Sequence, residues 1–367
     1  MSLMVEPEAL RRFGALMQRA GEDVAAGAEH VDRYAFREDA GGAWLAWFAP
    51  LYERTVDEVS TVLGRLRAVA DAAHAGLDQA SAYYTTTDQT VAATFDAGLP
   101  PGQCPPGDLD TELAAVCLPG GSFRDVREPQ QRLREPEPQE PTGPGGIPVG
   151  LLDTLSLSGA ALYTARAVFG FDPVERLTGP LLGDWERIAA CGTVLRQLAA
   201  LCSDIAVNIA AGDRTLMTYW SGNAAAAADD YITTLAVRTD RLADPITTIG
   251  QLHEQAATVV FTVAETIKGV VTTLIDLAVA AAAIMAAGTA LIETGVGPLV
   301  AAGVAATIIG ELYETYDTGT AALRTAYNVL TGLAGLIAAA SSRLETTWRC
   351  VRSRPVSAAA NSPSALR

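Results

Sequence analysis

The sequence predicts an all-α protein with three parts: an N-terminal antiparallel helical hairpin, a disordered proline-rich linker, and a bundle of long helices with a W-x-G turn. The 367 residues are 49% apolar but only 6% aromatic. Their apolar residues are mostly Ala, Leu and Val, and Ala and Leu favour helices. Apolar residues recur every three or four positions, and no segment shows the strict alternation that is typical of a half-buried strand.

The first predicted unit, residues 1–95, contains two amphipathic helices. The first carries an apolar stripe within residues 8–34, formed by Leu10, Phe13, Met17, Ala20, Val24, Val31 and Tyr34. A Gly-containing break follows, and the apolar period resumes from Trp44 to Leu77. Two long helices joined by a short turn fold back as an antiparallel hairpin. Because each apolar stripe is narrow, we expect the hairpin to pack against a second hairpin, in a homo-oligomer or a small partner.

The second predicted part is a linker at residues 96–149. It is rich in Pro, Gly, Gln and Glu and contains few large apolar side chains. Such a composition does not bury enough surface to offset the entropy of ordering, so we predict a disordered linker. It contains Cys104 and Cys117, which we interpret as free thiols, with pairing as the alternative in an exported protein.

The third predicted part is a helical unit at residues 150–350, followed by a Ser/Ala/Pro-rich tail at 351–367 that we expect to fray. We expect a long helix from about Trp185 to Tyr219 and an interruption at 220–223. The next helix is expected to continue to about residue 267, with a kink at its proline.

The stretch 269–310 is nearly continuous Ala, Val, Ile and Leu. Its uncharged pieces, 277–292 and 294–310, are shorter than the roughly 20 residues that a membrane-spanning helix needs. We therefore prefer a core hairpin buried in the bundle. A membrane-inserting hairpin is the alternative interpretation.

Charge and motif content exclude several classes of function. The net charge is −16, with 42 acidic and 26 basic residues, which argues against binding to nucleic acid or to anionic lipid through a basic patch. The sequence contains no GxSxG, P-loop, HExxH or GxGxxG motif. Its five cysteines and three histidines show no metal-ligand spacing. We therefore expect no catalytic residue, no metal site and no cofactor.

Two short motifs remain. Trp220 and Gly222 form a W-x-G at the interruption between two predicted helices. Tyr84 and Asp88 form a Y-x-x-x-D directly after the predicted hairpin, and this spacing places ring and carboxylate side by side on a helix. The same tyrosine-to-acid spacing also occurs at Tyr34/Glu38 and Tyr313/Asp317. An ordinary surface pair is the simpler interpretation of each.

Residues 1–90 resemble the EspC-type proteins of actinobacterial type VII (ESX) secretion. The resemblance rests on the helix VEPEALRRFGALMQRAG, on the second helix GGAWLAWFAPLYERTVDEV, and on the Y-x-x-x-D that follows. In that family the tyrosine and acid after the hairpin form the export signal, which implies this role for Tyr84 and Asp88. The family often carries W-x-G in the turn, whereas this chain has tryptophans there without the glycine. Three aromatic residues of this region are candidates for a partner interface: Trp44, Trp47 and Phe48.

Residues 171–350 resemble the W-x-G-type helical leaders of actinobacterial polymorphic toxins. The resemblance rests on DPVERLTGPLLGDWERIAACG, TYWSGNAAAAADDYITTLA and the apolar stretch ETIKGVVTTLIDLAVAAAAIMAAGTALIETGVG. Those toxins continue into an enzymatic domain, which we do not expect here. By analogy, PE/PPE-type substrates combine a W-x-G on one helical pair with a Y-x-x-x-D on another as a composite signal. In this chain both elements would lie in one polypeptide.

These resemblances imply a non-enzymatic substrate or component of an ESX system that is secreted or displayed at the cell surface. The N-terminus lacks the apolar run of a Sec signal peptide, so export would depend on the Y-x-x-x-D motif. The implied partners are the ESX ATPase and a small ESX-like helical protein or a second copy. Two alternatives stay open: a pore-forming effector that inserts residues 269–310 into a membrane, and an intracellular chaperone or adaptor.

Overall fold

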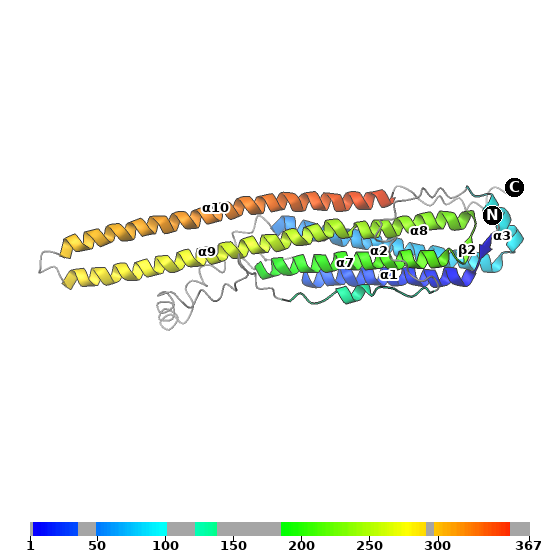
Figure 1. Cartoon of the computed structure of the whole chain (residues 1–367), viewed down its shortest axis with the longest axis horizontal. Coiled ribbons are helices and arrows are strands. Elements are labelled where there is room, and N and C mark those ends of the chain that lie inside the picture. Colours follow the sequence, from blue (N-terminus) through cyan, green and yellow to red (C-terminus); the bar gives the residue numbers. More distant parts are fainter. Residues whose placement is uncertain (1–2, 36–48, 101–121, 138–184, 291–296, 353–367) are drawn as a thin grey trace.

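The computed structural model describes residues 3–35, 49–100, 122–137, 185–290 and 297–352. Of these residues 88% are helical, which confirms the all-α prediction. The elements in chain order are β1 (Met4–Val5), α1 (Pro7–Tyr34), α2 (Ala49–Thr86), α3 (Gln89–Ala97), η1 (Pro129–Arg132), α7 (Trp185–Leu216), β2 (Trp220–Ser221), α8 (Asn223–Arg241), α9 (Ala243–Ala290) and α10 (Gly297–Arg352). The long helices lie along one axis, with β1, β2 and α3 at one end and the far ends of α9 and α10 at the other (Figure 1).

Helices α1 and α2 run antiparallel, because Gly14 lies opposite Leu77 and Gly21 lies opposite Ala70. Their apolar faces pack against other helices of the same chain. Gly27 of α1 approaches Leu198 of α7, so this chain itself supplies the helices that cover the hairpin. The narrow stripes predicted that the hairpin packs against something else. In this structure, α7 of the same chain packs against it.

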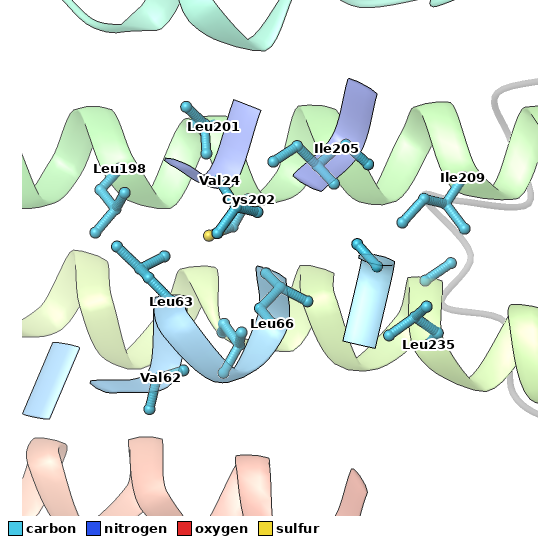
Figure 2. Close-up of a cluster of buried hydrophobic side chains, with 14 of the residues drawn as sticks. Val24, Val62, Leu63, Leu66, Leu198, Leu201, Cys202, Ile205, Ile209 and Leu235 are labelled. Carbon is cyan, nitrogen blue, oxygen red and sulfur yellow. The ribbon is translucent and has the colours of Figure 1, made fainter. Parts of the chain in front are cut away.

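One continuous core joins the two helical units that the sequence predicted. Figure 2 shows side chains from α1, α2, α7 and α8 in the same cluster, with Val24, Leu63, Leu198 and Leu235 among them. The end of α10 contributes to it as well, through Leu344. The described parts of residues 1–95 and 150–350 therefore fold against each other rather than as separate units.

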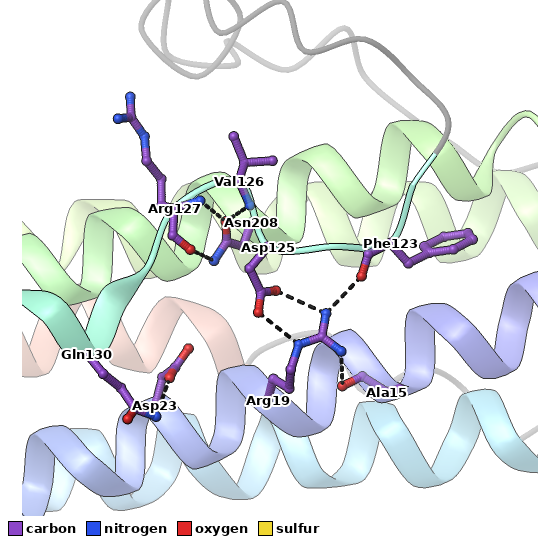
Figure 3. Close-up of polar contacts among 9 residues, drawn as sticks. All are labelled: Ala15, Arg19, Asp23, Phe123, Asp125, Val126, Arg127, Gln130 and Asn208. Carbon is purple, nitrogen blue, oxygen red and sulfur yellow. Dashed lines mark hydrogen bonds and ion pairs between the residues drawn. The ribbon is translucent and has the colours of Figure 1, made fainter.

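The structure corrects the predicted disorder for residues 122–137, which we call the strap. The strap lies across α1 and α7 and is held by side chains of both helices (Figure 3). Arg19 of α1 donates to both carboxylate oxygens of Asp125, at 2.8 and 3.0 Å. Gln130 donates to Asp23 of α1 at 2.8 Å, and Arg132 donates to Asp204 of α7 at 2.6 Å.

Asn208 of α7 is the strap's main backbone anchor. Its side-chain oxygen accepts from the backbone N–H groups of Val126 and Arg127, both at 2.9 Å, and its amide donates to the Arg127 carbonyl at 3.0 Å. Composition rules count buried apolar surface, and this segment offers little of it: Phe123 and Leu133 pack against the core, and the contacts that composition does not report are the polar ones to α1 and α7. Cys104 and Cys117 lie outside the described residues.

Replacing Asn208 by alanine is expected to loosen the strap without unfolding the bundle. The backbone amides of Val126 and Arg127 would then exchange with deuterium at least about tenfold faster, because each loses its acceptor. Exchange within α1 should stay unchanged. Arg124→Ala, at an exposed strap position, is the matched control. Equal exchange in both variants would show that Asn208 does not anchor the strap.

The structure also corrects two expectations for the C-terminal helices. Pro245 does not kink a helix; α8 ends at Arg241, and the proline lies in the first turn of α9, where a missing N–H is tolerated. The expected core hairpin at 269–310 is not buried in the bundle where its side chains are described. Among residues 269–277 only Leu277 is buried, and Ile309 is exposed. The tail from residue 353 onward lies outside the described residues.

By length and hydropathy, two stretches of the described helices are suited to crossing a membrane: α7 and the stretch Asn223–Leu277. In α7, 67% of the apolar window is buried, which is typical of the central helix of a bundle. In the second stretch only 11% of the most apolar 18-residue window is buried, so the surface of that window is largely uncovered by the chain.

Candidate functional site

The Y-x-x-x-D motif is divided between two helices at the end of the bundle. Tyr84 lies in the last turn of α2, which ends at Thr86. Asp88 lies outside that helix and caps α3, because its carboxylate accepts from the backbone N–H of Thr90 at 2.8 Å. The side-by-side arrangement expected for an i, i+4 pair is therefore not formed. An aspartate competes well for free N–H groups at a helix start, so it begins a new helix here.

The W-x-G motif lies beside Tyr84. Trp220 forms the two-residue strand β2 together with Ser221, and it pairs with Val5 of β1. This pairing ties the N-terminal segment across the turn between α7 and α8. The Trp220 side chain is only 6% exposed. Its ring centroid lies 6.2 Å from that of Tyr84 at an interplanar angle of 71°, an edge-to-face contact. The two motifs, far apart in the sequence, thus meet in one place.

Gly222 is required at the start of α8 for two reasons. Its φ is +130°, in the region that L side chains rarely adopt. A Cβ at this position would lie 2.6 Å from a carboxylate oxygen of Asp96. That carboxylate accepts from the backbone N–H groups of Asn223 at 3.0 Å and Ala224 at 2.8 Å, so Asp96 of α3 caps α8.

Asp96 is a site residue that the sequence analysis missed. It is buried, and its backbone carbonyl also accepts from the Asn223 side chain at 3.0 Å. A signal for it was present: an acid in the last turn of a helix is unfavourable for that helix's dipole, which suggests that it serves another element. Asp96 fixes α3 onto the W-x-G turn. We call the group of Tyr84, Asp96, Trp220 and Gly222 the Tyr84–Trp220 site.

Four buried titratable groups outside the Tyr84–Trp220 site have shifted pKa values. Burial raises the pKa values of Cys191 and Cys202 to about 12, so both are protonated at neutral pH. Burial lowers the pKa of His253 to about 4 and, together with nearby Asp229, raises the pKa of Asp213 to about 8. Within the described ranges, no group of three or more His, Cys, Asp or Glu side chains could hold a metal ion.

The described surface includes two sizeable hollows among others. One of about 470 Å³ lies between α2 and α10, and one of about 680 Å³ lies between the strap and α7. Neither is lined by a histidine or a cysteine.

The remaining predicted site residues are not part of this arrangement. Trp44, Trp47 and Phe48 lie outside the described residues. Tyr34 ends α1, and Tyr313 lies exposed on α10. Among the tyrosines of the three tyrosine-to-acid matches, Tyr84 is the one found in ring contact with Trp220.

Comparison with known proteins adds no relative: no family model, no curated protein and no solved structure matches this chain. The site is therefore interpreted from its own geometry.

Proposed function

We propose that this protein is a non-enzymatic substrate or component of an actinobacterial ESX secretion system and carries both halves of a composite export signal in one chain. The observation that supports this proposal is the edge-to-face contact between Tyr84 and Trp220. It brings the Y-x-x-x-D and W-x-G motifs to one end of a folded bundle. A receptor can recognise the folded surface at this end of the bundle, so recognition does not require an apolar signal peptide.

The local architecture suits recognition of a fixed surface. Asp88 starts α3, and Asp96 fastens α3 to the start of α8, so the aromatic pair lies on a rigid frame. Beside it, Tyr83 is 42% exposed and Phe95 is 68% exposed. Exposed aromatic side chains near the centre of a small interface contribute much of the binding energy. The ESX ATPase is the partner that we propose for this surface.

The proposal includes a location and a second partner. The protein would be secreted or displayed at the cell surface. Helix α7 and the helices after it already pack against the hairpin formed by α1 and α2. A small ESX-like partner, or a second copy, would bind on the outer surface of the bundle.

The test is an immunoblot of culture filtrate and cell lysate from hosts with and without the ESX ATPase. We expect the wild-type protein in the filtrate only when the ATPase is present. Tyr84→Ala is expected to reduce export at least about tenfold, because it removes the ring that contacts Trp220. Tyr231→Ala is the matched control, since Tyr231 of α8 is also half-buried against the same core but lies outside the site.

Thermal unfolding of both purified variants separates lost recognition from lost folding. Export of Tyr84→Ala at the wild-type level would contradict the proposed signal. Retention of the wild-type protein in the lysate of both hosts would favour the intracellular chaperone or adaptor instead.

A further inference from the structure

The end of the molecule opposite the Tyr84–Trp220 site consists of α9 and α10 alone among the labelled helices. The ring of Trp185, the first residue of α7, lies 5.0 Å from that of Phe261 on α9. Beyond this level, α9 and α10 continue side by side past the ends of α1, α2 and α7 (Figure 1). We call this part, α9 after Phe261 and α10 before Ala326, the projecting pair.

Contacts within the projecting pair define how its helices are aligned. Val263 of α9 packs in one small cluster with Ala326 of α10. Farther out, a Cβ at Gly319 would lie 3.4 Å from the Val270 side chain. The helices are thus antiparallel. Moving seven residues toward the tip on α9, from Val263 to Val270, corresponds to moving seven residues toward the tip on α10, from Ala326 to Gly319. Continued at the same register, this alignment places Leu277 of α9 level with Leu312 of α10.

Charge is divided sharply along the projecting pair. Its inner part carries Glu265, Lys268 and Asp276 on α9 and Glu311, Glu314, Asp317 and Arg324 on α10. Its outer part, Leu277–Ala290 on α9 and Gly297–Gly310 on α10, contains no charged residue. We call this outer part the uncharged tip. Because of the register, charged residues stop at nearly the same level on both helices.

Aromatic side chains mark that level on α10. Tyr313 is 73% exposed and Tyr316 is 68% exposed. They share one helical face with the exposed Ile309, because the spacings are three and four residues. Glu311 and Glu314 fall on another face of the same turns. An exposed apolar stripe of this kind does not stabilise the bundle in water.

The uncharged tip has the dimensions of a segment that enters a bilayer without crossing it. Each helix contributes about 14 residues, or about 21 Å at 1.5 Å per residue, against about 30 Å of hydrocarbon. Tyrosine is enriched where a membrane protein meets the headgroups, which is the place of Tyr313 and Tyr316 just outside the tip.

We propose that the uncharged tip binds and partly enters a zwitterionic phospholipid bilayer. The charged residues stop at nearly the same level on both helices, and tyrosines lie at that level. A planar boundary between water and hydrocarbon requires this arrangement. Packing against a second copy would not require it. The net charge of −16 favours neutral over anionic lipid, since anionic headgroups repel acidic residues near the surface.

The test is flotation of the purified full chain with phosphatidylcholine vesicles in a density gradient. Ala280→Asp combined with Ile309→Asp places a charge on each helix of the projecting pair, at positions that are exposed in the structure. We expect the vesicle-bound fraction to fall at least about tenfold. The matched control is Ala321→Asp combined with Leu336→Asp, which also replaces one alanine and one large aliphatic residue, at exposed positions of α10 farther from the tip. This control should float like the wild type.

Absence of wild-type flotation, or equal flotation of the two double variants, would overturn the proposal. A third result would also overturn the proposal: the wild type does not float, but it dimerises without vesicles and the tip variant does not. The uncharged tip would then bind a second copy of the chain instead of a bilayer. Export is tested separately at the other end of the molecule. Tyr84→Ala is expected to float like the wild type. The flotation result and the export result therefore test the two proposals independently.

Discussion

Replacing Gly192 by alanine is expected to destabilise the fold by about 2–4 kcal/mol, lowering the unfolding temperature by roughly 5–10 °C. Helices α7 and α9 lie close together at this point. A Cβ on Gly192 would lie 2.6 Å from the backbone carbonyl oxygen of Gly250, and a Cβ on Gly250 would lie 2.8 Å from the carbonyl oxygen of Gly192. Because both obstacles are backbone atoms, no side-chain rotation relieves the clash, and the helices must separate.

Gly76→Ala is the matched control for that experiment. Gly76 lies within α2, and a Cβ there would meet nothing within 4 Å. Alanine is better than glycine inside an exposed helix by about 0.5–1 kcal/mol, so this variant should be slightly more stable than the wild type. Thermal unfolding monitored by circular dichroism measures both changes. Shifts of the same sign in the two variants would contradict a tight crossing at Gly192.

Replacing Asp213 by asparagine is expected to stabilise the protein at pH 8 far more than at pH 5. Asp213 lies in the last turns of α7 and is only 3% exposed. Burial, followed by repulsion from Asp229 of α8, raises its pKa from 3.8 to about 8, while a hydrogen bond from Thr233 and the charge of Arg214 lower it. The folded protein therefore holds a proton that the unfolded chain releases.

The sign of the effect follows from that proton. Stability from a protonated Asp213 is fully present below about pH 4 and is lost as the pH rises through about 8. Each unit of pKa difference corresponds to about 1.4 kcal/mol, so the full loss is on the order of several kcal/mol. Asparagine has nearly the same shape but never ionises, and its oxygen can still accept from Thr233. The advantage of the variant should therefore grow steadily from pH 5 to pH 8.

Unfolding temperatures at pH 5 and pH 8 test this expectation. His253 also makes stability depend on pH, because burial lowers its pKa from 6.5 to about 4. The stability contributed by the neutral imidazole is present above about pH 6.5 and is lost as the pH falls to about 4. Comparing variant with wild type at each pH cancels this contribution. Asp244→Asn, at an exposed position of α9, is the control and should shift both temperatures equally. An equal gain for Asp213→Asn at both pH values would show that its carboxyl group is not protonated in the fold.

The helices were largely predictable because their signal is local. The stripe in residues 8–34 became α1, Pro7–Tyr34, and the helix expected from Trp185 to Tyr219 became α7, Trp185–Leu216. The interruption at residues 220–223 was predicted from the W-x-G formed by Trp220 and Gly222 between two amphipathic stretches. In each case residues within one or two turns decide the structure, so spacing alone is informative.

The strap shows why other features were not predictable. Its composition is that of a disordered segment, yet Arg19 binds Asp125 across 106 positions of the sequence, and Asn208 holds its backbone. Composition reports how much apolar surface a segment can bury. It does not report which polar groups a distant helix will offer.

For the candidate site, the two motifs and the helices that carry them are visible in the local sequence pattern. The folded chain adds three facts that no local pattern reports: Tyr84 contacts Trp220, Asp96 caps α8, and Asp88 begins a helix instead of flanking the tyrosine. Likewise, the apolar character of residues 269–310 is visible in the sequence, whereas the position of its described parts, 269–290 and 297–310, beyond the ends of α1, α2 and α7 is visible only in the packing of α9 beside α10. The physical reason is the same in each case: periodicity and capping act over a few residues, while contacts between helices depend on how the whole chain packs into one core.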